Sequence, residues 1–207
     1  MVADSEERRK AIYVANEALA VSRSNAINKF AEIEQHLAML FNALQQQGTG
    51  TDSFTAFARL KGNGVRLQTI QALVDKQCPQ YSTYFSRLSK RISRLEATRN
   101  KIVHWIQMTS RHNGSFSVAL FEHPDLSKHG RLTKDAVDHF IDKAAFYSML
   151  AFYLSVHVRH PQTVNYPSPG DMRPWLTIYA EALVFPPVAD HPFHPDRMKP
   201  LPFVGAT

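Results

Sequence analysis

Apolar residues recur at three- and four-residue steps along most of this chain, which is the spacing of one face of a helix. The first segment with helical character, 5–22, contains no Gly or Pro, and Ser24 is a candidate N-cap for a second helix at 25–47. The apolar face of that second helix is formed by Phe30, Ile33, Leu37, Leu40 and Leu44. The residues GTGTD then end it.

The next segments are shorter. The stretch 52–65 is broken by GNG, and a helix through Leu67, Ile70, Leu73 and Val74 stops near Pro79.

The clearest helix follows, with one stripe at alternating steps of four and three: Tyr81, Phe85, Leu88, Ile92, Leu95, Arg99 and Ile102. Arg99 is the one charged member of this stripe. A charge on an apolar face is costly unless it is paired or faces a wet cleft.

After His104 the period changes. WIQMTS and SFSVALF read as two short strands joined by the Asn-Gly turn of RHNG, so the helix should end near residue 104. The last long helix is predicted from an N-cap at Thr133, with Asp135 in its first turn, to about residue 158. Beyond Ala144 apolar residues surround this helix, so we expect neighbours on two sides, one of which could be a second subunit.

These elements predict an all-α protein: an antiparallel helical bundle with a small β-hairpin before its last long helix and a Pro-rich C-terminal arm. The bundle occupies 1–160. The extension, 161–207, holds ten of the 12 prolines and a candidate short helix at 175–183. The rest of the extension is an arm lying on the domain or a flexible tail.

Composition narrows the classes of partner. Lys+Arg number 24 against 18 Asp+Glu, a formal net charge of +6, which suits a polyanion. The single cysteine, Cys78, excludes an intrachain disulfide framework and a thiolate metal cluster. The N-terminal residues lack the apolar core of a signal peptide, and the most apolar run, 144–158, is too short to span a bilayer. We therefore expect a cytoplasmic protein with no membrane partner.

The candidate chemistry lies in RNKIVH, which contains Arg99, Asn100 and His104. A guanidinium matches phosphate with a forked pair of donors, and an imidazole exchanges protons near neutral pH. Five residues of continuous helix turn through about 500°, so Arg99 and His104 converge only if the helix ends or unwinds at about residue 103. RNA carries its own nucleophile, the 2′-hydroxyl, so this pair needs neither a metal nor a protein nucleophile to cleave it.

RNKIVH resembles the Arg-x4-6-His motif of HEPN domains (higher eukaryotes and prokaryotes nucleotide-binding), including the polar residue directly after the arginine. The architecture over 5–160 also resembles that family, with the motif late in an inner helix. The resemblance implies a metal-independent, cofactor-free endoribonuclease, often a toxin or phage-defence effector, that works as a homodimer with both motifs facing one cleft. It implies that Arg99 binds the scissile phosphate, that His104 is the general acid/base, and that Asn100 orients them or bonds the phosphate.

Further residues could support this site. Arg87, Arg91, Arg94 and Lys101 lie beside the apolar stripe and could guide an RNA backbone, although a solvated helix face has the same pattern. Glu34, beside the apolar face of the second predicted helix, could pair with Arg99, although we favour a surface carboxylate at this position. HEPN toxins controlled by nucleotidyltransferase antitoxins often carry a modified tyrosine where this chain has Ile106, so tyrosine AMPylation is not expected, and an antitoxin or other regulatory protein stays an open partner.

Other interpretations of the motif remain. An arginine and a histidine near a helix C-terminus can simply complement the dipole and bond terminal carbonyls. Some HEPN domains are inactive and bind RNA or protein. A DNA-binding regulator ranks last, because no recognition helix follows a tight turn. We expect no metal site, since the pairs His157/His160 and His191/His194 lack a third ligand in register.

Overall fold

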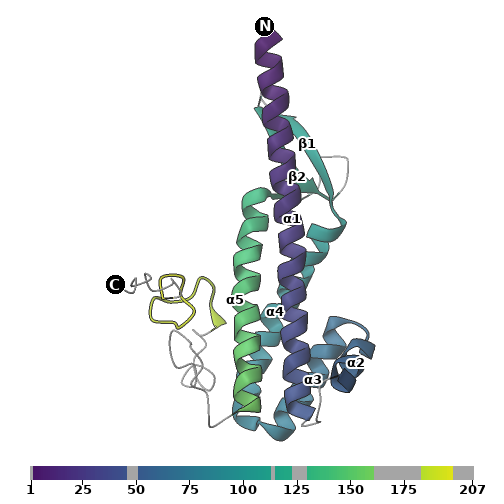
Figure 1. Ribbon diagram of the computed structural model, residues 1–207, viewed down its shortest axis with the longest axis vertical. Coiled ribbons are helices and arrows are strands. Elements are labelled where there is room, and N and C mark those ends of the chain that lie inside the picture. The colour runs from purple at the N-terminus through teal and green to yellow at the C-terminus, as the bar shows by residue number, and fades with distance from the viewer. Residues whose placement is uncertain (1, 46–50, 113–114, 123–129, 161–182, 198–207) are drawn as a thin grey trace, which may run out of the picture. The chain divides into compact units, whose positions relative to one another are not determined.

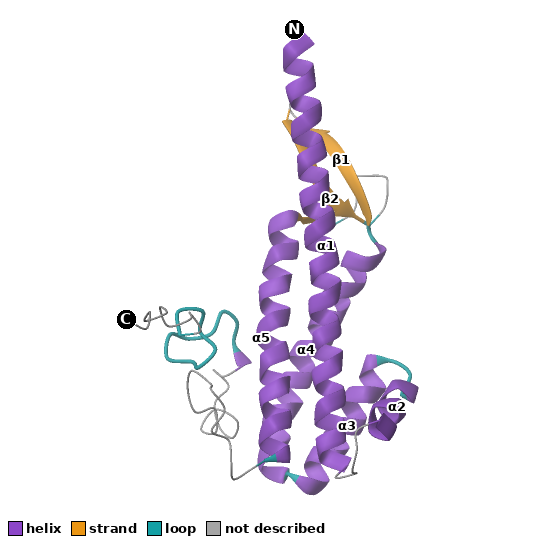
Figure 2. Ribbon diagram, viewed as in Figure 1, coloured by secondary structure: helices purple, strands orange, loops and turns teal. Residues whose placement is uncertain are grey.

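The computed structural model describes residues 2–45, 51–112, 115–122, 130–160 and 183–197. Helix accounts for 75% of these residues, and a small antiparallel sheet completes the structure (Figures 1 and 2). The helices are α1 (Val2–Gln45), α2 (Thr51–Arg59), α3 (Asn63–Gln77), the 3-10 turn η1 (Pro79–Tyr81), α4 (Ser82–His104) and α5 (Lys134–Arg159). The strands are β1 (Ile106–His112), β2 (Ser115–Phe121) and β3 (Arg131–Thr133).

The chain forms two compact units that share three helices. The first unit comprises residues 1–33 and 94–145, and the second comprises 34–93 and 146–207. Each of α1, α4 and α5 is therefore divided between the two units. The candidate motif at the end of α4 belongs to the first.

In the first unit, the sheet lies beside α1 (Figure 1). The Gln107 side chain donates to the backbone oxygen of Asn16 at 2.8 Å, and the Asn16 amide donates to Thr109 Oγ1 at 3.1 Å. Both bonds fasten α1 to β1. The core of the unit is apolar and is formed by Leu19, Ala26, Phe30, Ile33, Leu95, Ile102, Ala119, Leu120, Phe121, Val137, Phe140 and Ala144.

The predicted hairpin is confirmed, and it carries one strand more than expected. β1 and β2 pair antiparallel from Ile106 opposite Phe121 to His112 opposite Ser115. β3 then pairs with β2, placing Thr133 opposite Ala119. A three-residue strand has no period of its own, and it forms because the edge of β2 offers it hydrogen bonds. The Asn-Gly turn at 113–114 lies outside the described residues.

In the second unit, residues 183–197 cover part of α5. The buried Tyr147 hydroxyl donates to the backbone oxygen of Leu183 at 3.0 Å. The Phe146 and His191 rings lie 5.3 Å apart, centroid to centroid, and the Tyr153 and Phe193 rings 5.6 Å apart. The apolar surroundings predicted for this part of α5 are therefore supplied in part by the chain's own later residues. Residues 175–182 of the candidate short helix lie outside the described structure.

The first two predicted helices are one helix. α1 runs for 44 residues from Val2, and Ser24 is an exposed residue within it, so the predicted N-cap is wrong. No Gly or Pro interrupts the junction, and Leu19, Ala26 and Phe30 continue one buried face across it. By contrast, the predicted cap of α5 is confirmed, because the backbone N–H of Ala136 donates to Thr133 Oγ1 at 3.3 Å.

The break at GNG is also confirmed, but it falls earlier than expected. α2 ends at Arg59, and Gly62 adopts a φ of 85° immediately before α3 begins at Asn63. Residues 63–65, assigned to the end of the preceding segment, thus belong to α3. A φ in this range is readily adopted only by glycine, so Gly62 fixes where α3 starts.

Candidate functional site

The apolar stripe of α4 positions the candidate site. Its members Phe85, Leu88, Ile92, Leu95 and Ile102 are all buried, and the half-buried Arg99 stands in line between the last two. α4 ends at His104, as the sequence predicts. The helix therefore holds the guanidinium of Arg99 on the side that contacts α1 in the first unit.

Arg99 has no carboxylate partner among the described residues. Its Cζ lies 5.9 Å from the centre of the Phe30 ring on α1, and Nη1 donates to the Asn100 side-chain oxygen at 3.1 Å. Its Nε is buried without a hydrogen-bond partner in the described structure. A buried donor without an acceptor costs stability, and this Nε is shielded from solvent, so only the terminal nitrogens of the guanidinium could meet an anion.

Asn100 is exposed and directly follows Arg99. Its oxygen accepts the bond from Arg99 Nη1, which restrains the guanidinium over Phe30. Its amide group remains at the surface. This geometry is the one that an orienting residue needs, since it contacts the arginine and also faces solvent.

His104 lies on another side of α4. The helix shows no unwinding at residue 103: α4 includes His104, and the Trp105 N–H still donates to the Lys101 backbone oxygen at 2.9 Å. Five helical residues amount to about 500°, so Arg99 and His104 leave the axis about 140° apart. Arg99 is half-buried and His104 is exposed. The convergence that we expected from local unwinding is thus not supplied by α4 itself.

An arginine from α1 caps the end of α4. Arg23 Nη2 donates to the Val103 backbone oxygen at 2.6 Å, next to His104. The last carbonyls of a helix lack intrahelical donors and carry partial negative charge. A guanidinium there donates the missing hydrogen bond and compensates that charge. The sequence contains the signal for this contact. Arg23 interrupts the buried face of α1, between Leu19 and Ala26, as Arg99 interrupts that of α4.

The residue after His104 is also held in place. The Lys101 Nζ lies 5.3 Å from the centre of the Trp105 ring. On the other side, a Cβ at Gly130 would lie 3.2 Å from Trp105 Cη2. Trp105 therefore packs against the residue just before β3, with a cation over its ring.

The predicted RNA-guiding residues share one side of α4. Arg87, Arg94 and Lys101 are exposed, and Arg91 is half-buried. Steps of four, three and seven residues keep all four within one side of a helix. We name them the basic flank. α4 as a whole carries six Lys/Arg residues and one Glu.

Glu34 does not support Arg99. It pairs instead with Arg66, whose Nη1 lies 2.8 Å from Glu34 Oε1. Arg66 also donates to the Leu60 backbone oxygen and lies over the Phe57 ring. The possible pairing of Glu34 with Arg99 is therefore not observed, and Glu34 fastens α3 to α1 in the second unit.

No family model, no curated protein and no solved structure matches this chain. Within the described ranges, no group of three or more His, Cys, Asp or Glu side chains is arranged to hold a metal ion. None of the helices seen there is both long and apolar enough to cross a membrane. The candidate site consequently depends on the geometry and chemistry of the residues above.

Proposed function

We propose that this chain is a metal-independent endoribonuclease of the HEPN type, a helical bundle that acts on RNA in the cytoplasm as a homodimer. The observation that supports the proposal most is Arg99, a guanidinium that has no carboxylate partner in the described part of the chain. It stands between buried Leu95 and Ile102 and lies five residues before an exposed imidazole. A role as a toxin or phage-defence effector, controlled by an antitoxin or another regulatory protein, belongs to the same proposal.

In the proposed reaction the RNA 2′-hydroxyl attacks the neighbouring phosphorus. His104 accepts the hydroxyl proton, and a water molecule donates a proton to the leaving 5′-oxygen. The products are a 2′,3′-cyclic phosphate and a free 5′-hydroxyl. Arg99 stabilises the negative charge that grows on the phosphate oxygens. Asn100 keeps the guanidinium in place, and the basic flank attracts the RNA backbone.

A second copy of the chain would place an imidazole beside Arg99, which a single copy does not do. Because Arg99 and His104 leave α4 on different sides, we propose that Arg99 of one copy acts with His104 of the other. A two-fold dimer then contains two such composite sites and two histidines. A single chain would hold the phosphate without placing an imidazole beside it.

The first test measures cleavage of a labelled single-stranded RNA in EDTA. Wild type should cleave, and Arg99→Ala and His104→Ala should each lower the rate by about 100-fold or more, as removal of a transition-state donor or a general base does. Arg131→Ala and His160→Ala are matched controls, since both residues are exposed and lie outside the site. Undiminished cleavage in both site variants would remove the proposed mechanism.

A mixing experiment tests the composite site. A heterodimer of Arg99→Ala with His104→Ala retains one intact Arg99–His104 pair across its interface. Random pairing of the two inactive variants makes half of the dimers heterodimers, each with one of two sites intact, so mixing should restore about a quarter of the wild-type rate. Sites formed within single chains would stay inactive after mixing, and that result would reject the shared site while leaving the residue roles open to the first test.

A second function is favoured by one specific observation. The angle between Arg99 and His104, together with the bond from Arg99 to Asn100, suits an inactive HEPN-like module that binds RNA or a protein without cutting. Such a module would bind single-stranded RNA in a way that depends on Arg99 and is insensitive to His104→Ala. Binding with this pattern, and no cleavage by wild type, would favour it over the ribonuclease.

A further inference from the structure

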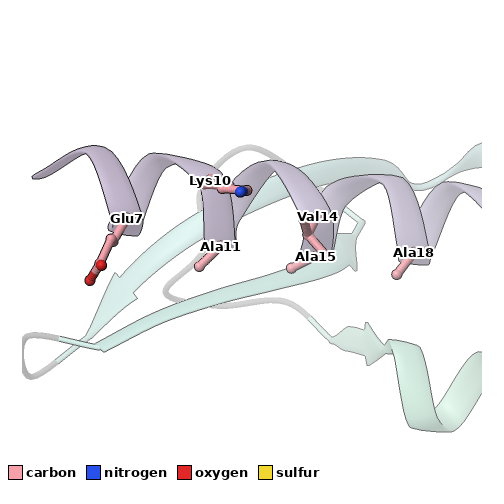
Figure 3. A pocket seen from close by; sticks show the side chains of 6 residues that line it. All are labelled: Glu7, Lys10, Ala11, Val14, Ala15 and Ala18. Atoms are coloured by element: carbon pink, nitrogen blue, oxygen red, sulfur yellow. The ribbon is translucent and has the colours of Figure 1, made fainter. Parts of the chain in front are cut away.

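The first half of α1 exposes a nearly continuous apolar face. Tyr13, Val14 and Val21 are 63%, 56% and 60% exposed, whereas Leu19 on another side of the helix is fully buried. A hollow of about 470 Å³ lies along this face (Figure 3), lined by Glu7, Lys10, Ala11, Val14, Ala15 and Ala18. Exposed apolar faces of this kind commonly mark protein–protein contacts.

The spacing on this face is that of a coiled coil. Glu7, Ala11, Val14, Ala18 and Val21 follow one another at steps of four, three, four and three, which is the seam of a heptad pattern. The buried face of α1, through Leu19, Ala26 and Phe30, lies about 120° around the helix from this seam. The seam is thus available to another helix after the first unit has formed its own core.

The charges beside the seam favour a second, antiparallel copy of α1 as the binding partner. Lys10 and Glu17 are seven residues apart, so they occupy the same flanking position in successive heptads. In an antiparallel pair of identical helices this position meets its own counterpart. Lys10 of each copy then faces Glu17 of the other, and the two-fold axis makes the pair twice. In a parallel pair the same position would face Ala15 and Ser22, which carry no charge.

We propose that this face binds a second copy of itself, with the two α1 helices antiparallel. The seam from Glu7 to Val21 is about 21 Å long at 1.5 Å per residue, or two heptads. An interface of that size is at the small end of the specific range, so the dimer dissociates at micromolar concentrations. It stands apart from the ribonuclease proposal: a chain that pairs through α1 and cleaves nothing would support it fully.

The first test is sedimentation velocity of the full chain from about 1 to about 200 µM, the range in which a weak dimer dissociates. Wild type should shift from monomer to dimer. Val14→Glu and Val21→Glu should each raise the dissociation constant at least about tenfold, because each adds two carboxylates to a seam that already includes Glu7 of both copies. Val65→Glu on α3 is the matched control at 47% exposure and should change nothing. Circular dichroism checks that each variant folds.

Charge reversal tests the antiparallel pairing. Lys10→Glu alone, or Glu17→Lys alone, places like charges opposite each other twice per dimer and should weaken it by about tenfold. The double variant restores both opposite-charge pairs and should recover most of the wild-type affinity. A local effect, such as loss of the bond from the Tyr13 hydroxyl to Glu17, would not be repaired in this way.

Three results would overturn the proposal. Wild type could remain a monomer throughout this concentration range. A dimer unaffected by Val14→Glu and Val21→Glu would use another surface. A double charge reversal without recovery would reject the antiparallel arrangement.

Discussion

Arg99 occupies a position where an apolar residue would serve folding better. Its neighbours along the stripe are buried Leu95 and Ile102, and its Nε is buried without a partner in the described structure. Its contacts are a ring and an adjacent amide, neither of which compensates a charge as a carboxylate does. Residues that reduce stability at such positions are typical of binding and catalytic sites.

This argument gives a stability prediction. Arg99→Met keeps the unbranched stem and removes the charge, so the free energy of unfolding should stay equal or rise by about 1 kcal/mol. Urea denaturation measures it. Arg94→Met, at an exposed position of the same helix, should change the free energy by less than about 0.5 kcal/mol. A clear loss of stability in Arg99→Met would mean that the guanidinium has a structural role.

Two buried tyrosines should respond oppositely to loss of the hydroxyl. Tyr84 Oη is buried without a partner among the described residues, whereas Tyr147 Oη donates to the Leu183 oxygen. Tyr84→Phe should leave the free energy of unfolding unchanged or raise it by up to about 1 kcal/mol, and Tyr147→Phe should lower it by about 1 kcal/mol. Equal losses of unfolding free energy in the two variants, measured by urea denaturation, would contradict the difference in hydrogen bonding between the two hydroxyls.

Tyr84 also makes the stability of the fold depend on pH. Burial raises the pKa of Tyr84 above its usual 10.0, so the folded protein keeps a proton that the unfolded chain releases. The stability associated with this difference is complete below pH 10 and is lost as the pH rises above it. Tyr84→Phe should therefore lose less stability than wild type between pH 10 and pH 11, in the same urea measurement.

The sequence identifies the unusual residues but not all of their partners. The period of α4 is enough to single out Arg99, because one charge among six apolar members is visible in the sequence. That Phe30 lies beneath it, and that Glu34 pairs with Arg66 instead, depends on how α1 is rotated against α3 and α4. Periodicity within one helix carries no information on that rotation.

At the scale of elements, helix ends differ in how clearly the sequence marks them. The end of α4 was predictable because the apolar period changes from helix to strand at Trp105, and Thr133 stands alone before a clear helical face. Ser24 has the chemistry of a cap, yet the buried face of α1 continues through it. A capping residue is therefore evidence for a helix start only where the face is interrupted.

The two capping candidates provide a matched prediction. Thr133→Ala removes the acceptor of the Ala136 N–H and should lower the free energy of unfolding by about 1 kcal/mol. Ser24→Ala replaces an exposed residue within a helix by the best helix former, so it should raise that free energy by a few tenths, about 0.3 kcal/mol. Thermal unfolding followed by circular dichroism compares them. A loss in Ser24→Ala equal to that in Thr133→Ala would contradict a continuous α1.

At the scale of the whole molecule, the net charge of +6 is unevenly distributed. α4 carries six Lys/Arg residues against one Glu, so most of the excess charge of the chain lies on one helix. Each phosphate that these residues neutralise releases counterions from RNA, which makes binding salt-dependent. The composition alone shows the excess. Only the helical spacing shows that four of these residues share a side.

The salt dependence can be measured. If the four residues of the basic flank contact phosphates, log K for a single-stranded RNA should fall with log salt at a slope of about −3. Replacing Arg87, Arg91, Arg94 and Lys101 by Gln should remove most of this slope and leave about −0.7 from the phosphate contact of Arg99. A comparable set of exposed cations elsewhere, Lys61, Lys76 and Arg131, serves as the control. An unchanged slope in the fourfold variant would locate RNA binding on another surface.

The contact of Trp105 with Gly130 has a consequence of its own. Position 130 precedes β3 and contributes no group to the candidate chemistry, yet any side chain there would have to move the indole that directly follows His104. A position 26 residues along the sequence thus limits the space of the indole next to His104, so even an alanine at position 130 would require this ring to shift by a few tenths of an ångström.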